Sequence, residues 1–205
     1  MAGLLAVERV GAIVLAAGAG SRFGGGKLLA PLEGRPVLQH VLDALGGLGV
    51  GTIVVVLGHD ARAIEATIAW RDEQRVVNGA PQQGLSGSVR LGFAALVFAP
   101  VDAVLVVLGD QPRLEPAVIH ALLAAPINDE RPVAVPRYAD EGSGPNPVLL
   151  LRSAWPLVDT LIGDRGLGPL LAARPDLVVE VPVAGSNPDI DTREDLARLS
   201  GGASA

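Results

Sequence analysis

The residues best suited to chemistry lie in a glycine-rich run near the start of the chain, from Ala16 to Lys27. Lys27 closes this run and is the only lysine among the 16 Lys and Arg residues of the sequence. Because every other cationic residue is an arginine, the lysine at this position suggests a need for a compact ammonium rather than a guanidinium. Glycine lets the backbone approach a ligand with its N–H groups pointing inward, so the run, with Arg22 and Lys27, predicts an anion cradle. The alternative is a flexible surface turn that happens to hold a lysine.

The glycine spacing of this run fits neither common nucleotide-binding motif. Gly18, Gly20 and Gly24 follow the pattern Gly-x-Gly-x-x-x-Gly, one residue longer than a dinucleotide fingerprint. Asp60 lies far beyond the interval at which an acidic residue binds the ribose in such sites. The run also lacks the Gly-Lys-Ser/Thr ending of a P-loop. A nucleoside triphosphate stays open as the ligand.

Two acidic clusters are candidates for holding a metal ion. Asp110, in the Gly-Asp-Gln-Pro segment at 109–112, directly follows the apolar run 103–108. A carboxylate at the end of a buried strand is placed to hold Mg²⁺ against phosphate oxygens, although Gly, Asp and Pro also make plain turns. Asp191 would supply a second carboxylate to the same ion. Taken alone, Asp191 is more simply a residue at the start of a helix, where the helix dipole favours an acid.

A polar stretch from Asn78 to Arg90 is a third candidate region. Asn78 follows a predicted strand, and Ser86 and Ser88 lie where a helix starts. Side chains and N–H groups at a helix start bind an anion or fix a base. An ordinary N-cap is the other interpretation of Ser86, and the two do not exclude each other.

These residues need a scaffold of alternating strands and helices. Continuous apolar runs predict buried strands, and apolar residues at helical spacing predict helices after Pro36, from Asp60 to Trp70, from Ser86 to Val97, and from Pro116. The expected strands of this half cover residues 10–16, 52–57, 75–77 and 103–108. The pattern predicts an α/β fold with three αβα layers around a mostly parallel, Rossmann-like sheet. Ligands of such sheets gather where the strands end.

The second half of the sequence is less regular. Strands are expected at 132–136, 147–151 and 177–183, and helices at 153–162 and 168–173. Thr192 and Asp195 resemble a capping box before a last helix. We expect one domain over residues 1–200 and a frayed, disordered tail over 201–205.

Composition excludes several classes of function. The formal net charge is −6 with no basic run outside the glycine-rich loop, so no nucleic-acid partner is expected. The absence of cysteine excludes disulfides, thiolate zinc sites and cysteine nucleophiles. The three histidines show no metal-ligand spacing. The sequence shows no signal-peptide pattern and no apolar run of the ~20 residues that cross a bilayer, so we expect a cytoplasmic protein without a membrane contact.

Taken together, these residues resemble the MobA-like nucleotidyltransferases, whose pattern is Leu-Ala-x-Gly-x-x-x-Arg-x-Gly-x-x-Lys. Leu15, Ala16, Gly18, Arg22, Gly24 and Lys27 match that pattern. Within this family the chain is most similar to the molybdenum cofactor cytidylyltransferases. These carry Leu-Ala-Ala-Gly at the loop, and Gly-Asp-Gln-Pro after the strand that leads to the proposed metal-binding aspartate. Further segments match in order at 56–60, 84–88, 163–164 and 189–192, over nearly the whole chain. Pro145-Asn146 replaces the common Gly-His, and Gly87 replaces a serine, both on the side expected to meet the acceptor.

The resemblance implies a glycosyltransferase-A-type fold and transfer of CMP from CTP onto the phosphate of molybdopterin, with Mg²⁺ as cofactor and pyrophosphate as leaving group. A molybdenum hydroxylase would receive the product. The catalytic residues would be Arg22, Lys27 and Asp110, and the metal ligands Asp110 and Asp191. The implied nucleotide-binding residues are Leu15, Ala16, Ala17, Gly18, Gly20, Arg22, Lys27, Asn78, Ser86, Ser88 and Asp110. Arg90 would face the nucleotide or the acceptor.

Three alternatives remain. The first is another transferase of this fold, moving GMP to a pterin or CMP to a sugar-like alcohol phosphate. The second is a nicotinamide-dependent oxidoreductase, against which the glycine spacing argues. The third is a non-catalytic pterin carrier, which would not need Asp110 or Lys27.

Overall fold

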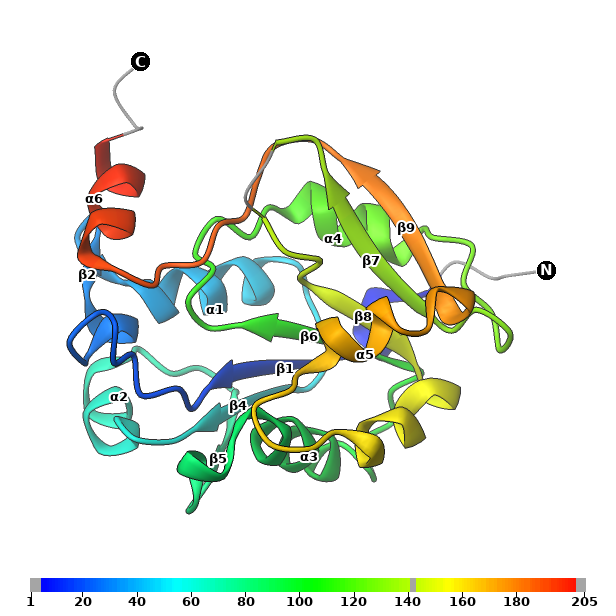
Figure 1. The fold of residues 1–205 in the computed structure, drawn as a ribbon, viewed down its shortest axis with the longest axis horizontal. Helices are drawn as coiled ribbons and strands as arrows, with labels where there is room; N and C mark the ends of the chain where they lie inside the picture. Colours follow the sequence, from blue (N-terminus) through cyan, green and yellow to red (C-terminus); the bar gives the residue numbers. More distant parts are fainter. Residues whose placement is uncertain (1–4, 141–142, 202–205) are drawn as a thin grey trace.

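One seven-stranded sheet forms the centre of the protein, with the strand order β5-β4-β1-β6-β8-β7-β9 (Figure 1). The structure, a computed structural model, describes residues 5–140 and 143–201. β1 pairs in parallel with β4 and β6, whereas β8 runs antiparallel between β6 and β7. The strands of the sheet are β1 (Val10–Ala16), β4 (Ile53–Leu57), β5 (Gln74–Val77), β6 (Ala103–Leu108), β7 (Val133–Tyr138), β8 (Val148–Leu151) and β9 (Val178–Val183).

Helices cover both faces of this sheet, which gives the three predicted layers (Figure 1). Residues of α1, α2 and α4 belong to the core on one face, and residues of α3, η4 and α5 to the core on the other. The helices are α1 (Val37–Gly47), α2 (Ala61–Thr67), α3 (Leu85–Ala95), α4 (Pro116–Leu123), α5 (Leu167–Ala172) and α6 (Arg193–Gly201). Short 3-10 segments are η1 (Val7–Arg9), η2 (Lys27–Leu29), η3 (Pro81–Gln83), η4 (Arg152–Thr160) and η5 (Pro175–Leu177), and β2 (Pro31–Leu32) pairs with β3 (Arg35–Pro36).

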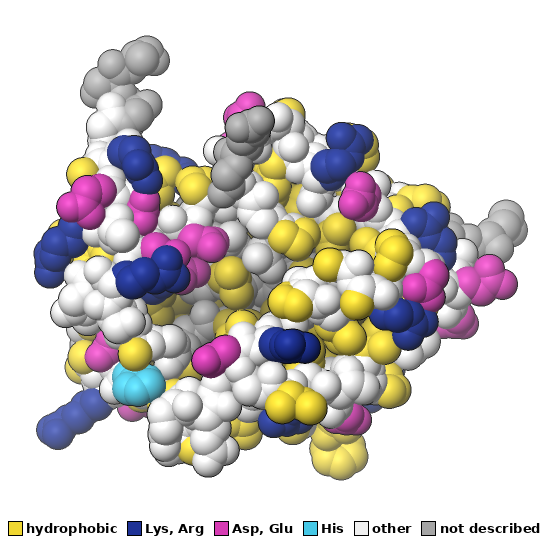
Figure 2. All heavy atoms as spheres, viewed as in Figure 1, with side chains coloured by type: hydrophobic (Ala, Val, Ile, Leu, Met, Phe, Trp, Pro, Cys, Tyr) yellow, Lys and Arg dark blue, Asp and Glu magenta, His cyan; other side chains and the backbone are white. Residues whose placement is uncertain are grey.

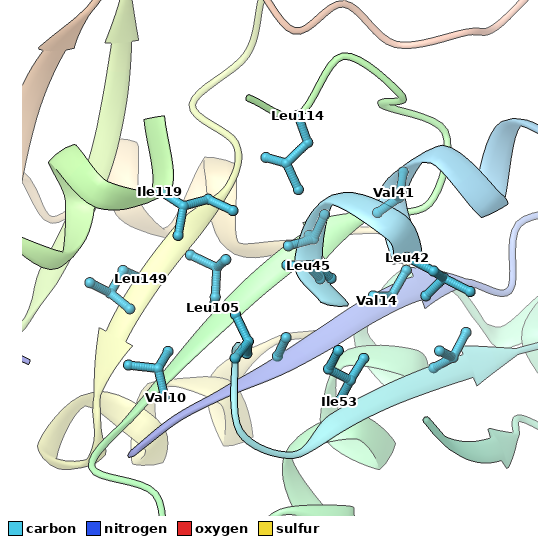
Figure 3. Packing of buried hydrophobic residues seen from close by; sticks show 14 of the residues in the cluster. Val10, Val14, Val41, Leu42, Leu45, Ile53, Leu105, Leu114, Ile119 and Leu149 are labelled. Carbon is cyan, nitrogen blue, oxygen red and sulfur yellow. The ribbon is translucent and has the colours of Figure 1, made fainter. Parts of the chain in front are cut away.

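Burial on both faces explains why the central strands are apolar without interruption. Val14 of β1 faces the α1 side, while its neighbour Ile13 faces α3. Figure 3 shows Val41 and Leu45 of α1 packed over Val14 and over Leu105 of β6. Successive strand residues point to opposite faces, so a strand covered on both sides needs apolar residues at every position. The α/β prediction from these runs is confirmed.

Several predicted boundaries are wrong for local physical reasons. The second helix ends at Thr67 because Ile68 takes extended backbone angles, so Trp70 lies outside it. α3 ends at Ala95 rather than Val97. The predicted helix at 153–162 is the 3-10 segment η4, which contains Pro156. A proline inside a helix removes an amide donor, which disfavours regular α-helical bonding there. Gly201 belongs to α6, and residues 202–205 of the predicted tail lie outside the described residues.

The described helices are all too short or too polar to cross a bilayer.

Because β1, β4 and β6 run in parallel, they end at the same edge of the sheet. The candidate chemistry gathers at this edge.

Candidate active site

The loop after β1 is held in a shape that requires glycine. Gly20 has a φ of 58°, and Gly24, Gly25 and Gly26 also have positive φ. Other residue types rarely adopt these angles. The loop is fastened from two sides: Phe23 is buried against Leu32 and Ile190, and the Gly26 N–H donates to Oδ2 of Asp60 at 3.3 Å. The loop is therefore anchored rather than a loose turn.

An aspartate directly before a helix, as Asp60 is before α2, commonly caps the helix with its side chain. It occupies the residue before that helix, but its carboxylate makes no cap bond there. Its bond to the Gly26 N–H connects the carboxyl end of β4 to the loop after β1 instead. Sequence reasoning missed this role because an aspartate before a helix already has a sufficient local explanation.

Lys27 lies between the two predicted metal ligands. Its Nζ is 2.6 Å from Oδ2 of Asp110 and 3.4 Å from Oδ1 of Asp191, and only 12% of its side chain is exposed. Burial acts to lower the pKa of the lysine, but the charges of Asp110 and Asp191 outweigh burial and leave the pKa above its usual value. A fixed, protonated ammonium therefore stands at the edge of the sheet.

Arg22 reaches the same group from the loop. Its Nη2 is 3.0 Å from Oδ2 of Asp191, while 74% of its side chain remains exposed. Figure 2 shows acidic and basic side chains next to one another on the side of the molecule where β1 and β6 end. The structure thus brings together Arg22, Lys27, Asp110 and Asp191, which come from three distant parts of the sequence.

The start of α6 is capped without the Asp191 carboxylate. The Thr192 N–H donates to Oδ2 of Asp195 at 2.7 Å, and the Asp195 N–H donates to the Thr192 hydroxyl at 3.2 Å. Thr192 and Asp195 therefore cap the helix, as predicted. The Asp191 carboxylate instead contacts Lys27 and Arg22.

Two carboxylates that share one cationic neighbour also fit a divalent metal. The described residues contain no cluster of three or more His, Cys, Asp or Glu that would hold an ion by protein ligands alone. Mg²⁺ is usually bound by one or two carboxylates together with substrate phosphates. Asp110 and Asp191 match that pattern in number and in donor type.

A network of buried amides lies behind these carboxylates, and sequence reasoning missed it. Gln111 is fully buried, and its Nε2 donates to Oδ1 of Asp189 at 2.5 Å. Asn187 Nδ2 donates to Oε1 of Gln111 at 3.5 Å. Burial raises the pKa of Asp189, the negative charge of Asp110 raises it further, and the Gln111 bond opposes them. The only sequence signal was a glutamine between turn residues.

A cavity of about 450 Å³ opens beside the loop. Ala17, Gly18 and Ser88, all predicted nucleotide-binding residues, line it, together with His59 and Asp164. His59 was not predicted to belong to a site, and its Nδ1 lies 3.4 Å from the Ala17 carbonyl oxygen. The cavity joins the end of β1 to the start of α3.

Four further predicted nucleotide-binding residues lie in or next to the end of β1 and the start of α3, with defined protein contacts. Asn78 is buried, donates from Nδ2 to the Ser88 hydroxyl at 3.0 Å and accepts the Ala80 N–H at 2.9 Å. Leu15 and Ala16 are buried, and the Leu15 carbonyl accepts the Gly109 N–H at 3.0 Å. Gly20 belongs to the loop, with Lys27 packed beside it.

The expected N-cap at Ser86 is wrong, because α3 begins at Leu85 with Gly84 before it. Ser86 is buried, and its N–H donates to the Gly163 carbonyl at 3.0 Å. A Cβ on Gly84 would lie 2.3 Å from the carbonyl carbon of Gly163, so this close approach needs glycine. Arg90, expected to face the nucleotide or the acceptor, donates from Nη1 to the Leu161 carbonyl at 2.6 Å. These contacts hold the segment that carries Asp164 against α3.

Comparison with known proteins agrees with this arrangement. Residues 12–178 match the MobA-like NTP transferase domain. The bifunctional protein GlmU of Exiguobacterium sp. (strain ATCC BAA-1283 / AT1b) is 36% identical over 136 residues, which cover 65% of this chain but only 30% of GlmU. The chain therefore corresponds to less than a third of that relative.

Solved structures match over almost the whole chain. The crystal structure of Rv0371c from Mycobacterium tuberculosis H37Rv has a TM-score of 0.81 and 31% identity, covering 95% of this chain and 98% of that one. A manganese complex of Rv0371c has a TM-score of 0.76 and 30% identity, covering 93% and 97%. The predicted resemblance is thus confirmed at the level of the family: the chain belongs to the MobA-like NTP transferases and is a nucleotidyltransferase.

Proposed function

We propose that this nucleotidyltransferase moves CMP from CTP onto the phosphate of a molybdopterin-type acceptor and releases pyrophosphate. The observation that carries the proposal is the meeting of Lys27, Asp110 and Asp191 beside an anchored glycine loop and a cavity. The choice of cytosine and of the pterin rests on the Leu-Ala-Ala-Gly and Gly-Asp-Gln-Pro segments, which take the forms found in the molybdenum cofactor cytidylyltransferases. We expect the reaction in the cytoplasm, with a molybdenum hydroxylase as the recipient of the product.

The residues suit nucleotidyl transfer because this chemistry needs positioning and charge neutralisation more than a new nucleophile. The backbone N–H groups of Gly18 and Gly20, with Arg22 and Lys27, bind the triphosphate. Lys27 keeps its proton, so it stabilises the charge that builds on the departing pyrophosphate. The acceptor phosphate is already an anion and needs no base to attack the α-phosphorus.

Asp110 and Asp191 would hold Mg²⁺ between them. The bound ion supplies charge neutralisation at the phosphates. The manganese complex of Rv0371c supports a divalent metal in this family. Ala17 and Ser88 line the cavity, where Ala17 would meet the base, and Asn78 supports Ser88 from behind through its Nδ2 bond to the Ser88 hydroxyl.

Calorimetric titration with CTP, GTP and NADPH, each with and without Mg²⁺, tests the proposal first. Mg²⁺-dependent binding of CTP in preference to GTP is the expected result. Preference for GTP would reassign the enzyme to guanylyl transfer. Binding of NADPH with no response to either triphosphate would refute nucleotidyl transfer to this acceptor. Given CTP binding, an anaerobic assay with molybdopterin should yield the cytosine dinucleotide and pyrophosphate.

A further inference from the structure

We infer that Gln111 is a positioning residue, which fixes Asp191 relative to Asp110 by holding Asp189 and Asn187 against the turn after β6. This inference rests on the proposed metal role of the two aspartates. It concerns a residue that would not touch the metal, the nucleotide or the acceptor.

The segment that carries Asp191 depends on such contacts for its position. Residues 184–192 form neither helix nor strand, so no ladder of backbone bonds fixes them. Their connections to the sheet edge include the Gln111 bonds to Asp189 and Asn187, the Ile190 N–H donating to the Asp110 carbonyl at 3.0 Å, and the buried Ile190 side chain. The Asp191 carboxylate adds its own contacts with Lys27 and Arg22. Gln111 supplies the hydrogen bonds that hold Asp189 and Asn187 in that connection.

The positions of Gln111 and Asp189 in the sequence link this connection to the geometry of the proposed metal site. Gln111 is the residue after Asp110, and Asp189 is two residues before Asp191, although Gln111 and Asp189 are 78 positions apart. The bond from Gln111 to Asp189 is short and involves a carboxylate, which makes it stronger than a bond between neutral groups. A shift of either partner would therefore change the separation of the two carboxylates. Residues that orient metal ligands in this way typically change metal affinity 10- to 100-fold when they are replaced.

Gln39 provides a matched control. It is also a buried glutamine, with Nε2 donating to Asp43 at 3.1 Å and Oε1 accepting the Ala69 N–H at 2.9 Å. Its bonds connect α1 to the segment after α2, and neither partner is a proposed metal ligand. Replacing Gln39 or Gln111 by leucine removes the same group from a buried, hydrogen-bonded position. Loss of stability is therefore expected from both, and loss of metal binding only from Gln111→Leu.

The test measures free Mn²⁺ by electron paramagnetic resonance, with the protein alone and with CTP, in the absence of acceptor. The Kd of Gln111→Leu for Mn²⁺ should rise about 10-fold or more, whereas that of Gln39→Leu should match the wild type. An equal Kd for both leucine variants would overturn the inference and leave Gln111 a structural residue. That outcome does not affect the CMP proposal, which fails instead if GTP binds in preference to CTP.

A second set of variants, in which the amide and the carboxylate exchange positions, tests the inference if Gln111→Leu does not fold. Gln111→Glu places two carboxylates against each other and should weaken Mn²⁺ binding. Adding Asp189→Asn restores a bond, because the new amide donates to the new carboxylate, and it returns the net charge to its original value. Mn²⁺ affinity should recover in this double variant. A double variant that binds Mn²⁺ as weakly as Gln111→Glu would refute the positioning role.

Discussion

The Lys27 ammonium lies 2.6 Å from the Asp110 carboxylate, although the two residues are 83 positions apart. The same ammonium contacts Asp191, so one lysine bridges both carboxylates that would hold the metal, and Arg22 adds a second positive charge at Asp191. Lys27 therefore has two roles. It would add positive charge at the phosphates, and it offsets negative charge on Asp110 and Asp191.

Lys27→Ala should lower turnover by about 10²-fold or more, because the variant loses a charge that acts on the transition state. Removing the ammonium also leaves Asp110 without its cationic partner, so that among the described residues only Arg22 compensates the two carboxylates, through its contact with Asp191. Mg²⁺ should therefore raise the Tm of the variant more than that of the wild type, since a ligand that binds only the folded state stabilises it. Steady-state kinetics and thermal melts with and without MgCl₂ measure both effects.

Arg9→Ala is the matched control for the loss of one positive charge. Arg9 pairs with Asp102 at the opposite edge of the sheet, where β1 and β6 begin. Its loss should leave turnover and the response of Tm to Mg²⁺ unchanged. Near-normal turnover of Lys27→Ala would remove the lysine from the mechanism.

Asp110→Asn should abolish metal-dependent turnover. The substitution keeps the size of the side chain but removes the charge that a hard divalent cation requires. Initial rates over a range of Mg²⁺ concentrations measure the change. A variant with unchanged Mg²⁺ dependence would show that the Gly-Asp-Gln-Pro segment is only a turn.

Asp191→Asn and Thr192→Ala should separate metal binding from helix capping. Asp191→Asn should weaken Mn²⁺ binding with little change in Tm, because Thr192 and Asp195 make the cap. Thr192→Ala removes the hydroxyl that accepts the Asp195 N–H and should cost about 1 kcal/mol of unfolding free energy, with Mn²⁺ binding retained. Urea unfolding and Mn²⁺ titration on both variants give the comparison. The opposite pattern would mean that Asp191 serves the start of α6.

The sequence contained enough information to predict the layers and the residues of the acidic pair. Val14 and Ile13 face opposite cores, and that double burial is directly visible as an unbroken apolar run. Asp110 and Asp191 were recognisable because carboxylates near the ends of strands gather at one edge of a parallel sheet.

The direction of β8 and the long-range contacts that hold the site's loops in place could not be predicted from the sequence in this way. Strand periodicity is the same for both directions, so the antiparallel pairing of β8 with β6 left no trace in the pattern. Gln111 and Asp189 meet across 78 positions, and Asp60 reaches Gly26 across 34. Each of these residues also has an ordinary local role, as part of a turn or as a helix start. Only the folded arrangement distinguishes those roles from long-range contacts.

Tyr138 gives a prediction about pH that a single chromophore can test. It is the only tyrosine of the chain, and its hydroxyl donates to the Asn146 carbonyl at 2.9 Å. Burial raises the pKa of this tyrosine to about 12. The unfolded chain has a tyrosine pKa of about 10, so the folded state favours the protonated phenol. Its contribution to stability is complete below about pH 10 and is lost as the pH rises through the folded value.

Near-ultraviolet absorbance of the phenolate should therefore give a midpoint of about 12 in the folded protein, and of about 10 in urea. Unfolding free energy should fall as the pH rises between these two values. Tyr138→Phe is the control, because it removes the absorbance change together with the pH dependence that comes from this group. A midpoint near 10 in the folded protein would show that the hydroxyl is solvated, and that its contact with Asn146 does not hold the segment before β8.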